Sequence, residues 1–133
     1  MTDNFQWISN DSASHDAYIT LDAMKRLYLS TKACAVMGLP KKEAFELFVG
    51  YDALNKRLVI AKPDLVSPVN VKPFKFDKRS YASARPLLDK MDVKVAQLPL
   101  RYNYVGRLHN DKMYPAGTYV FELDGHTAVD GRL

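Results

Sequence analysis

Three prolines in the middle of the 133-residue chain, Pro63, Pro68 and Pro73, limit how it can fold more than any other feature. Proline fixes the backbone φ angle and has no amide hydrogen to donate, so this stretch forms neither a helix nor a central strand. It is the internal boundary that the sequence offers. We therefore expect two structured segments around a proline-containing linker: residues 18–62, the linker 63–70, and residues 71–124.

The two ends of the chain lack a regular pattern. Residues 1–17 are rich in Ser, Asn and Asp, and we interpret them as a flexible leader, with residues 125–133 as a tail. Phe5, Trp7 and Ile8 alternate with polar residues, so the leader either docks loosely on the body or packs on a partner. At this length the two segments are expected to form one compact domain.

In the first segment, apolar and polar residues alternate as in a β-hairpin, and a short helix follows. Ser30 or Thr31 can cap this helix, and Gly38 supplies the left-handed residue that ends it. The predicted elements are strands at Tyr18–Leu21 and Arg26–Leu29, a helix up to Met37, and strands over residues 44–51 and 57–61.

The same order of elements returns in the second segment. Ser83 is predicted to cap a helix that has Pro86 in its first turn, where proline is tolerated. Asp92 stands where Gly38 stood, and Asp accepts a left-handed conformation more readily than most residues. The predicted elements are strands over 71–76 and 79–82, a helix over 84–91, and strands over 98–105 and 118–123.

This recurrence predicts two β-β-α-β-β repeats, hence an α+β fold that is mainly β; a fortuitous match of the elements stays an alternative. A unit of this size struggles to bury a core by itself, so two of them would complete each other. Superimposed from the helix ends, Met37-Gly38-Leu39 meets Met91-Asp92-Val93. In the same comparison, the turn pair Lys25-Arg26 is taken as equivalent to Lys78-Arg79.

Charge and cysteine content narrow the class of protein. The chain has a net charge of +4, with an acidic leader, a basic body and a neutral tail. A basic body suits a polyanionic partner, and it equally suits simple solubility. Cys34 is the single cysteine, so no internal disulfide can form. Neither a signal-peptide pattern nor an apolar run long enough to cross a bilayer occurs, so we expect a soluble, cytoplasmic protein without a membrane partner.

The first segment resembles the AbrB-like family of swapped-hairpin domains, which includes MazE-type antitoxins. The resemblance covers about residues 19–62 and is carried by Lys25–Ala33, Met37–Leu39, Phe45–Val49 and Arg57–Ile60. It implies that two hairpins interlock in a barrel, here within a single chain as a monomeric pseudo-dimer or in a homodimer. It also implies DNA contact by basic residues near the hairpin and helix, with Arg26 in the place of a family arginine. An Arg-Arg pair of some members is replaced here by Cys34 and Ala35, which puts DNA binding by that face in question.

Catalytic and metal-binding patterns are missing from the sequence. His15, His109 and His126 are scattered, and Cys34 has no second sulfur, so no metal site is expected. Cys34 lies among apolar helix residues, where packing is expected rather than nucleophilic catalysis. No glycine-rich phosphate loop occurs. We therefore predict a protein that is not an enzyme and needs no cofactor.

The basic residues in and near the turns are the sequence feature that favours a binding function. If the halves pair about a twofold axis, six cations would share one face and could contact DNA phosphates: Lys25, Arg26, Lys32, Lys78, Arg79 and Arg85. The competing interpretation is that these cations have no binding role, because turns are commonly polar and basic. Tyr102 and Tyr104 are flanked by Arg101 and Arg107, and Tyr114 lies in the next loop. These tyrosines either stack on bases or, as we favour, pack in the sheet.

Two hypotheses about function follow. The first is a small DNA-binding regulator of AbrB-like type that contacts the backbone of double-stranded DNA. The second is a non-catalytic protein-interaction module, such as a phage or mobile-element accessory factor that docks on a larger protein assembly, or an antitoxin-like partner.

Overall fold

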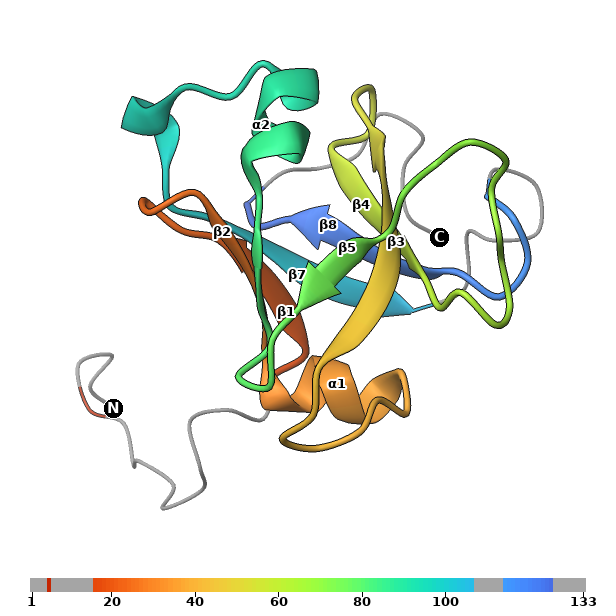
Figure 1. Cartoon of the computed structure of the whole chain (residues 1–133). Helices are drawn as coiled ribbons and strands as arrows, with labels where there is room; N and C mark the ends of the chain where they lie inside the picture. The colour runs from red at the N-terminus through yellow and green to blue at the C-terminus, as the bar shows by residue number, and fades with distance from the viewer. Residues whose placement is uncertain (1–4, 6–15, 107–113, 126–133) are drawn as a thin grey trace.

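The structure is a computed structural model that describes residue 5, residues 16–106 and residues 114–125 (Figure 1). Its strands form one antiparallel sheet of order β5-β3-β4-β8-β7-β1-β2-β6, which curls into a nearly closed barrel with two short helices. The mainly β character of the predicted fold is therefore confirmed. Trp7, Ile8, Arg107, the three histidines and the tail beyond Gly125 lie outside the described residues.

The elements are named in chain order. Before the linker come β1 (Tyr18–Leu21), β2 (Arg26–Leu29), α1 (Thr31–Val36), β3 (Phe45–Asp52) and β4 (Arg57–Ala61). After it come β5 (Phe74–Phe76), β6 (Tyr81–Ser83), α2 (Arg85–Met91), the 3-10 helix η1 (Val95–Gln97), β7 (Leu100–Gly106) and β8 (Tyr119–Leu123).

Predicted and observed elements agree best in the first segment, where β1, β2 and β4 have the expected bounds. The Ser30 side chain caps α1 as expected by accepting a hydrogen bond from the Ala33 amide, at 3.1 Å. In the second segment β5 begins only after Pro73, and β6 begins at Tyr81 instead of Arg79. The N-cap position of α2 is Ala84 instead of the predicted Ser83, although the Ser83 hydroxyl accepts a long hydrogen bond from the Arg85 amide, at 3.5 Å.

Each hairpin of the barrel pairs with strands from the other half of the chain. Strand β1 pairs with β7, β2 pairs with β6, and β5 pairs with β3. The strands at the two ends of the sheet order, β5 and β6, are joined by a tight turn in which the Asp77 amide donates to the Tyr81 carbonyl at 2.8 Å. This turn brings the two sheet ends together and nearly closes the barrel.

When the first four strands are exchanged for the last four, every strand pairing keeps a counterpart except β1–β2, since β5 and β6 are the two ends of the sheet order. Leu27 faces Ala82 where β2 meets β6, and Val59 faces Val120 where β4 meets β8. The Ala84 amide donates to the Lys25 carbonyl at 2.9 Å, and the Leu29 amide makes the corresponding bond to the Ser80 carbonyl at 3.1 Å.

Both helices end in the same way. Gly38 and Asp92 take left-handed conformations with φ of 67° and 55°. The residue after each of them donates its amide five residues back, Leu39 to Cys34 at 2.9 Å and Val93 to Leu88 at 3.3 Å. The left-handed conformation expected at Gly38 and Asp92 is therefore confirmed. Figure 1 shows α1 and α2 at opposite ends of the barrel.

The core lies inside the barrel and beneath the two helices. Fully buried side chains come from strands of both halves, among them Leu21, Leu27, Leu58, Tyr102 and Phe121. In the part of the chain that the structure describes, no helix combines the length and apolar character needed to cross a bilayer.

Truncating Leu27, which is fully buried where the two halves meet, should destabilise the whole barrel. We expect Leu27→Ala to lower the free energy of unfolding by about 2–5 kcal/mol, because the lost side chain leaves a cavity. The matched control is Val69→Ala, whose side chain is 84% exposed and whose truncation should cost less than about 0.5 kcal/mol. Urea unfolding of the three proteins measures this, and equal midpoints would contradict the assignment of Leu27 to a shared core.

Candidate functional site

Three tyrosines form a row across the outer face of three neighbouring strands, and we call them the tyrosine ladder. Tyr18 of β1 lies 6.4 Å from Tyr28 of β2, and Tyr28 lies 4.8 Å from Tyr81 of β6, measured between ring centroids. Successive strand residues point to opposite faces, so the ladder faces outward while Ile19 and Leu27 fill the core. The three rings are half-buried.

Arginine side chains lie over the rings at both ends of this ladder. The Arg101 guanidinium carbon is 4.0 Å from the Tyr18 centroid. At the other end, Arg26 lies 4.3 Å and Arg79 lies 5.9 Å from the Tyr81 centroid. These distances are within the range of cation–π attraction, so the Tyr81 ring attracts both Arg26 and Arg79.

The two hairpin turns have the same hydrogen-bond pattern. The Asp22 carboxylate accepts from the amides of Met24 and Arg26, and the Asp77 carboxylate accepts from the amides of Arg79 and Tyr81. The fourth turn residue has positive φ in both, 61° at Lys25 and 71° at Ser80.

This pattern corrects one prediction. Lys25-Arg26 corresponds to Ser80-Tyr81, so the predicted equivalence of Lys25-Arg26 with Lys78-Arg79 is wrong by two residues. Gly38 follows Lys25 by 13 residues and Asp92 follows Ser80 by 12, so an alignment from the helix ends shifts the turns by one residue. Matching the two Lys-Arg pairs shifted them by one more.

Five of the six predicted cations lie around two hollows, one lined by Tyr81 and the other by Tyr28. Lys25, Arg26 and Arg85 line a hollow of about 410 Å³ together with Lys75. Lys78 and Arg79 line a hollow of about 290 Å³, which also includes Lys41 and Lys42. These eight residues are here named the basic face.

Lys32 is separated from the basic face. It lines a third, shallow hollow of about 670 Å³ with Asp16, Arg101 and Asp124. The charges in that hollow are mixed, and Arg101 pairs there with Asp16 at 3.3 Å. The structure therefore does not bring Lys32 together with the other predicted cations.

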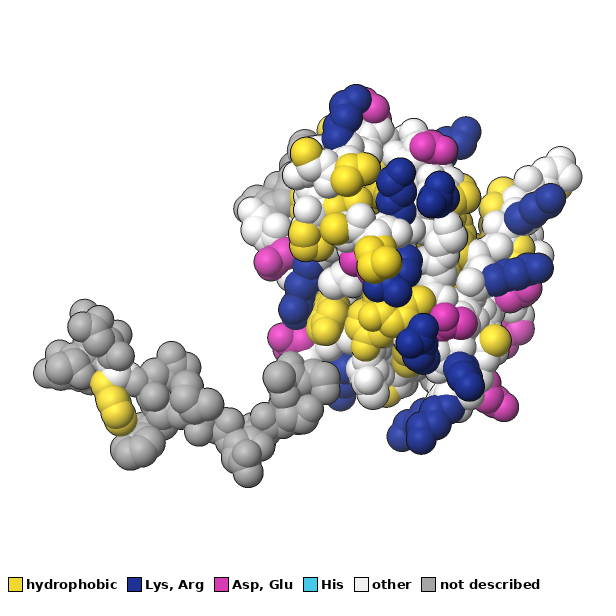
Figure 2. Space-filling view, turned by 60° about the vertical axis from the view of Figure 1, so that its left-hand side comes forward, with side chains coloured by type: hydrophobic (Ala, Val, Ile, Leu, Met, Phe, Trp, Pro, Cys, Tyr) yellow, Lys and Arg dark blue, Asp and Glu magenta, His cyan; other side chains and the backbone are white. Residues whose placement is uncertain are grey.

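Positive charge dominates the basic face. Arg26 pairs through Nε with Asp22 at 2.9 Å, while Lys78, Arg79 and Arg85 form no ion pair with any residue that the structure describes. The pKa of Asp77 is lowered by the backbone hydrogen bond from Tyr81, against a small opposing effect of burial, and by Arg79, so this carboxylate stays charged at neutral pH. Figure 2 shows Lys and Arg side chains spread among hydrophobic surface on the side it brings forward, with fewer acidic ones.

Sequence reasoning missed Lys41, Lys42, Lys75 and the tyrosine ladder. The alternation along β1 and β2 places Tyr18, Arg26 and Tyr28 on the outer face, so their orientation was readable. Their proximity to Tyr81 depends on the β2–β6 register, which pairs Tyr28 with Tyr81. No local signal encodes this pairing between residues that lie far apart in the chain.

The tyrosines considered for base stacking in the sequence belong to the interior instead. Tyr102 is 1% exposed, and Tyr104 packs against Tyr119 and Phe121 with ring centroids 6.4 and 5.3 Å away. The favoured prediction, packing in the sheet, is therefore confirmed for both. Tyr114 instead joins a polar network.

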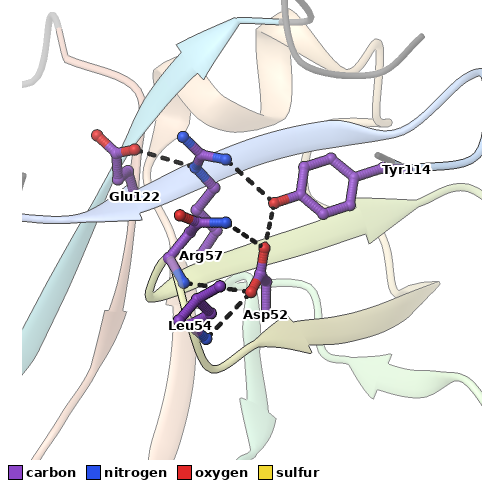
Figure 3. A network of polar contacts seen from close by, with 6 residues as sticks. Asp52, Leu54, Arg57, Tyr114 and Glu122 are labelled. Carbon is purple, nitrogen blue, oxygen red and sulfur yellow. Dashed lines mark hydrogen bonds and ion pairs between the residues drawn. The ribbon is translucent and has the colours of Figure 1, made fainter. Parts of the chain in front are cut away.

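That network lies beside the β3–β4 turn and contains a buried ion pair (Figure 3). Arg57 is fully buried, and its Nε lies 3.0 Å from an oxygen of Glu122 on the paired strand β8. Arg57 Nη1 donates to the Tyr114 hydroxyl at 3.2 Å, and this hydroxyl in turn donates to Asp52. The Asn55 side chain also donates to Asp52, at 2.9 Å.

Hydrogen bonds keep Asp52 ionised. Burial acts to raise its pKa, but donors on Tyr114 and Asn55 and the backbone amide of Leu54 outweigh burial, so the pKa lies below the usual value of 3.8. Burial raises the pKa of Tyr114, and its bond to Asp52 acts in the same direction, so the phenol stays protonated. The groups satisfy one another, and the network therefore fixes the turn rather than offering a reactive group.

Other chemical groups give no further site. No cluster of three or more metal-ligating side chains occurs among the described residues. Burial raises the pKa of the Cys34 thiol, which lies 3.5 Å from the Ser80 hydroxyl, so the nucleophilic thiolate is disfavoured. Comparison with known proteins adds no identification: no protein-family model, curated protein or solved structure matches the chain significantly.

Replacing Asp52 by Asn should destabilise the protein in a pH-dependent way. The folded-state pKa of Asp52 is lowered, so its contribution is complete above the unfolded-state value of 3.8 and is lost as pH falls through the folded-state pKa. The melting temperature of Asp52→Asn should lie below that of the parent at neutral pH, and the gap should narrow as pH falls below 3.8.

Asp64→Asn serves as the control, because the exposed Asp64 side chain makes no hydrogen bond with any described residue. Its melting temperature should track that of the parent at every pH. A gap for Asp52→Asn that stays constant from neutral to acid pH would contradict the role given to the ionised carboxylate.

Proposed function

We propose that this protein is a small, non-catalytic DNA-binding regulator built from two β-β-α-β-β repeats, a single-chain version of the AbrB-like swapped-hairpin barrel. The exchange of hairpins between the halves supports the architecture, because β1 and β2 pair with β7 and β6 while β5 pairs with β3. The corresponding registers at Leu27–Ala82 and Val59–Val120 support a duplication.

The observation that carries the DNA hypothesis is the meeting of Arg26 and Arg79 over the Tyr81 ring. Cations from both turns thereby join in one surface, which lysines and Arg85 extend on both sides. Such a surface attracts the phosphate backbone, and release of condensed counterions supplies most of the affinity. Tyrosine hydroxyls on the same surface can donate hydrogen bonds to phosphate oxygens.

The family arginine pair that is missing at Cys34 and Ala35 is compensated in this arrangement. Both residues line the hollow that Lys41, Lys42, Lys78 and Arg79 surround. Positive charge is thus present beside α1, although other segments supply it. Lysine carries its charge on a flexible ammonium group, whereas arginine carries it on a planar guanidinium that can form two parallel hydrogen bonds. Lysine therefore suits phosphate contact better than base recognition.

Salt dependence tests this proposal. Fluorescence anisotropy with a labelled random duplex should show binding at low salt, with an affinity that falls steeply as salt rises. Exchanging Lys25, Arg26, Lys78 and Arg79 for Ser should abolish most binding and reduce the slope of log affinity against log salt by up to about 3–4. The melting temperature should change little, because these side chains lie at the surface.

The matched control is Lys32→Ser with Lys56→Ser, compared with the double variants Lys25→Ser with Arg26→Ser and Lys78→Ser with Arg79→Ser. Lys32 and Lys56 are exposed and lie outside the basic face, so the same loss of charge should weaken binding far less. No binding by the parent at low salt, or equal effects of all three double variants, would rule out DNA contact through this face.

A second candidate function is the protein-interaction module. The segment around the linker exposes three large apolar side chains, with exposed fractions of 56% at Leu65, 84% at Val69 and 49% at Val71. Such a cluster is typical of a surface that a partner covers.

Under this hypothesis, copurification from the native source should recover one stoichiometric protein, and a variant with Ser at these three positions should lose it while the four-cation variant retains it. Recovery of a partner by both variants would contradict the assignment of this segment.

A further inference from the structure

The hollow of about 290 Å³ between α1 and the β5–β6 turn combines an apolar lining with a charged rim, and we call it the α1 hollow. Ala35, Leu39 and Pro40 supply apolar surface, and the half-buried Tyr28 ring adds an aromatic wall. Its volume is just below the range of about 300–1,000 Å³ in which small-molecule sites fall, and it suits one large side chain.

The rim of the α1 hollow is entirely basic in its charge. Lys41 and Lys42 approach from the segment after α1, and Lys78 and Arg79 approach from the turn. All four are exposed, and no acidic residue lines the hollow. A ligand bound through phosphate groups alone would need the cations but not the apolar lining. A ligand that has an apolar side chain with carboxylates beside it would use both the lining and the cations.

The backbone around the hollow is already held in place. Ser30 caps α1 at its start, and Lys62 Nζ donates to the Met37 carbonyl at 2.9 Å near its end. On the opposite side, the Leu29 amide donates to the Ser80 carbonyl and ties the turn to β2. A ligand would therefore lose little free energy in ordering the site.

We propose that the α1 hollow binds an acidic peptide segment of another protein, which inserts one large apolar side chain between α1 and the β5–β6 turn. The four rim cations attract the acidic residues on both sides of that anchor. Aromatic anchors bury the most area in such a contact, so Trp or Phe fits the lining best. The inference stands on this hollow and does not depend on DNA binding.

The test uses the full chain and a short fluorescein-labelled peptide with one central Trp between Asp and Glu residues. Two control peptides replace the Trp by Ser, or the acidic residues by Asn and Gln. We expect saturable anisotropy with the first peptide and about tenfold or greater weakening with either control. Equal binding of the peptide without Trp, or no binding of the first peptide up to about 1 mM, would overturn the proposal.

Ala35→Phe places a ring in the hollow, and Ala23→Phe is its matched control in the β1–β2 turn. Both alanines are exposed, so both variants should fold, which circular dichroism and melting check. Ala35→Phe should weaken the peptide about tenfold or more, while Ala23→Phe should stay within about twofold of the parent. Equal affinities of the two variants would contradict the site.

Two further measurements separate this inference from DNA binding. Lys25→Ser with Arg26→Ser should leave peptide affinity unchanged, because neither residue lines the α1 hollow. An oligothymidine that binds and is weakened by Ala35→Phe as strongly as the peptide would overturn the proposal in favour of an unpaired base in the hollow.

Discussion

The exchange of hairpins between the two halves is the constraint on which the rest of the structure depends. Strand β2 finds its second partner in β6, and β1 finds its second partner in β7, so neither half completes its own sheet. A hairpin with one free edge is marginal in water, and a unit of this size buries too little apolar surface to fold alone. Leu27 and Ala82 become buried because they face each other across this junction.

The same exchange brings surface groups from distant parts of the chain together. Since β2 and β6 are antiparallel, the two turns lie at opposite ends of this strand pair, and each turn lies beside the helix of the other half. Arg85 at the start of α2 therefore shares a hollow with Lys25, and Lys41 beyond α1 shares one with Lys78. Charges that look scattered in the sequence therefore gather around two hollows because of the topology.

How much of this could be predicted from the sequence depends on whether the signal is local. The alternation in β1 and β2 and the left-handed residues at Gly38 and Asp92 are local, and they gave the element order and the helix ends. Neither turn has Gly or Asn at its positive-φ position, where Lys25 and Ser80 stand, so the usual turn signal is missing from both. The second hairpin was placed two residues too early because its Lys-Arg pair was matched with that of the first. The strand predicted over residues 71–76 includes Pro73, and β5 begins only after that residue.

Groups defined by pairing across strands could not be predicted in the same way. Arg57 begins a strand in the sequence and looks like a surface cation, yet its partner Glu122 lies directly across from it and both are buried. Burial of such a pair is tolerated only where hydrogen bonds satisfy its remaining atoms, which the sequence does not reveal. The proximity of Arg26 to Tyr81 is hidden for the same reason.

Under the proposed duplication, the contact between Arg26 and Tyr81 also bears on what a single-chain barrel can do that a dimer of identical chains cannot. These residues hold corresponding places in the two turns, and their side chains meet across the β2–β6 pair at 4.3 Å. In a symmetric homodimer, corresponding places hold the same residue, so two arginines would repel or two tyrosines would lack a cation. When the two halves are joined in one chain, one half can supply the Tyr81 ring and the other half the Arg26 cation. Under the proposed function, the two sides of the basic face then differ, and a DNA target need not be palindromic, since operator symmetry mirrors protein symmetry.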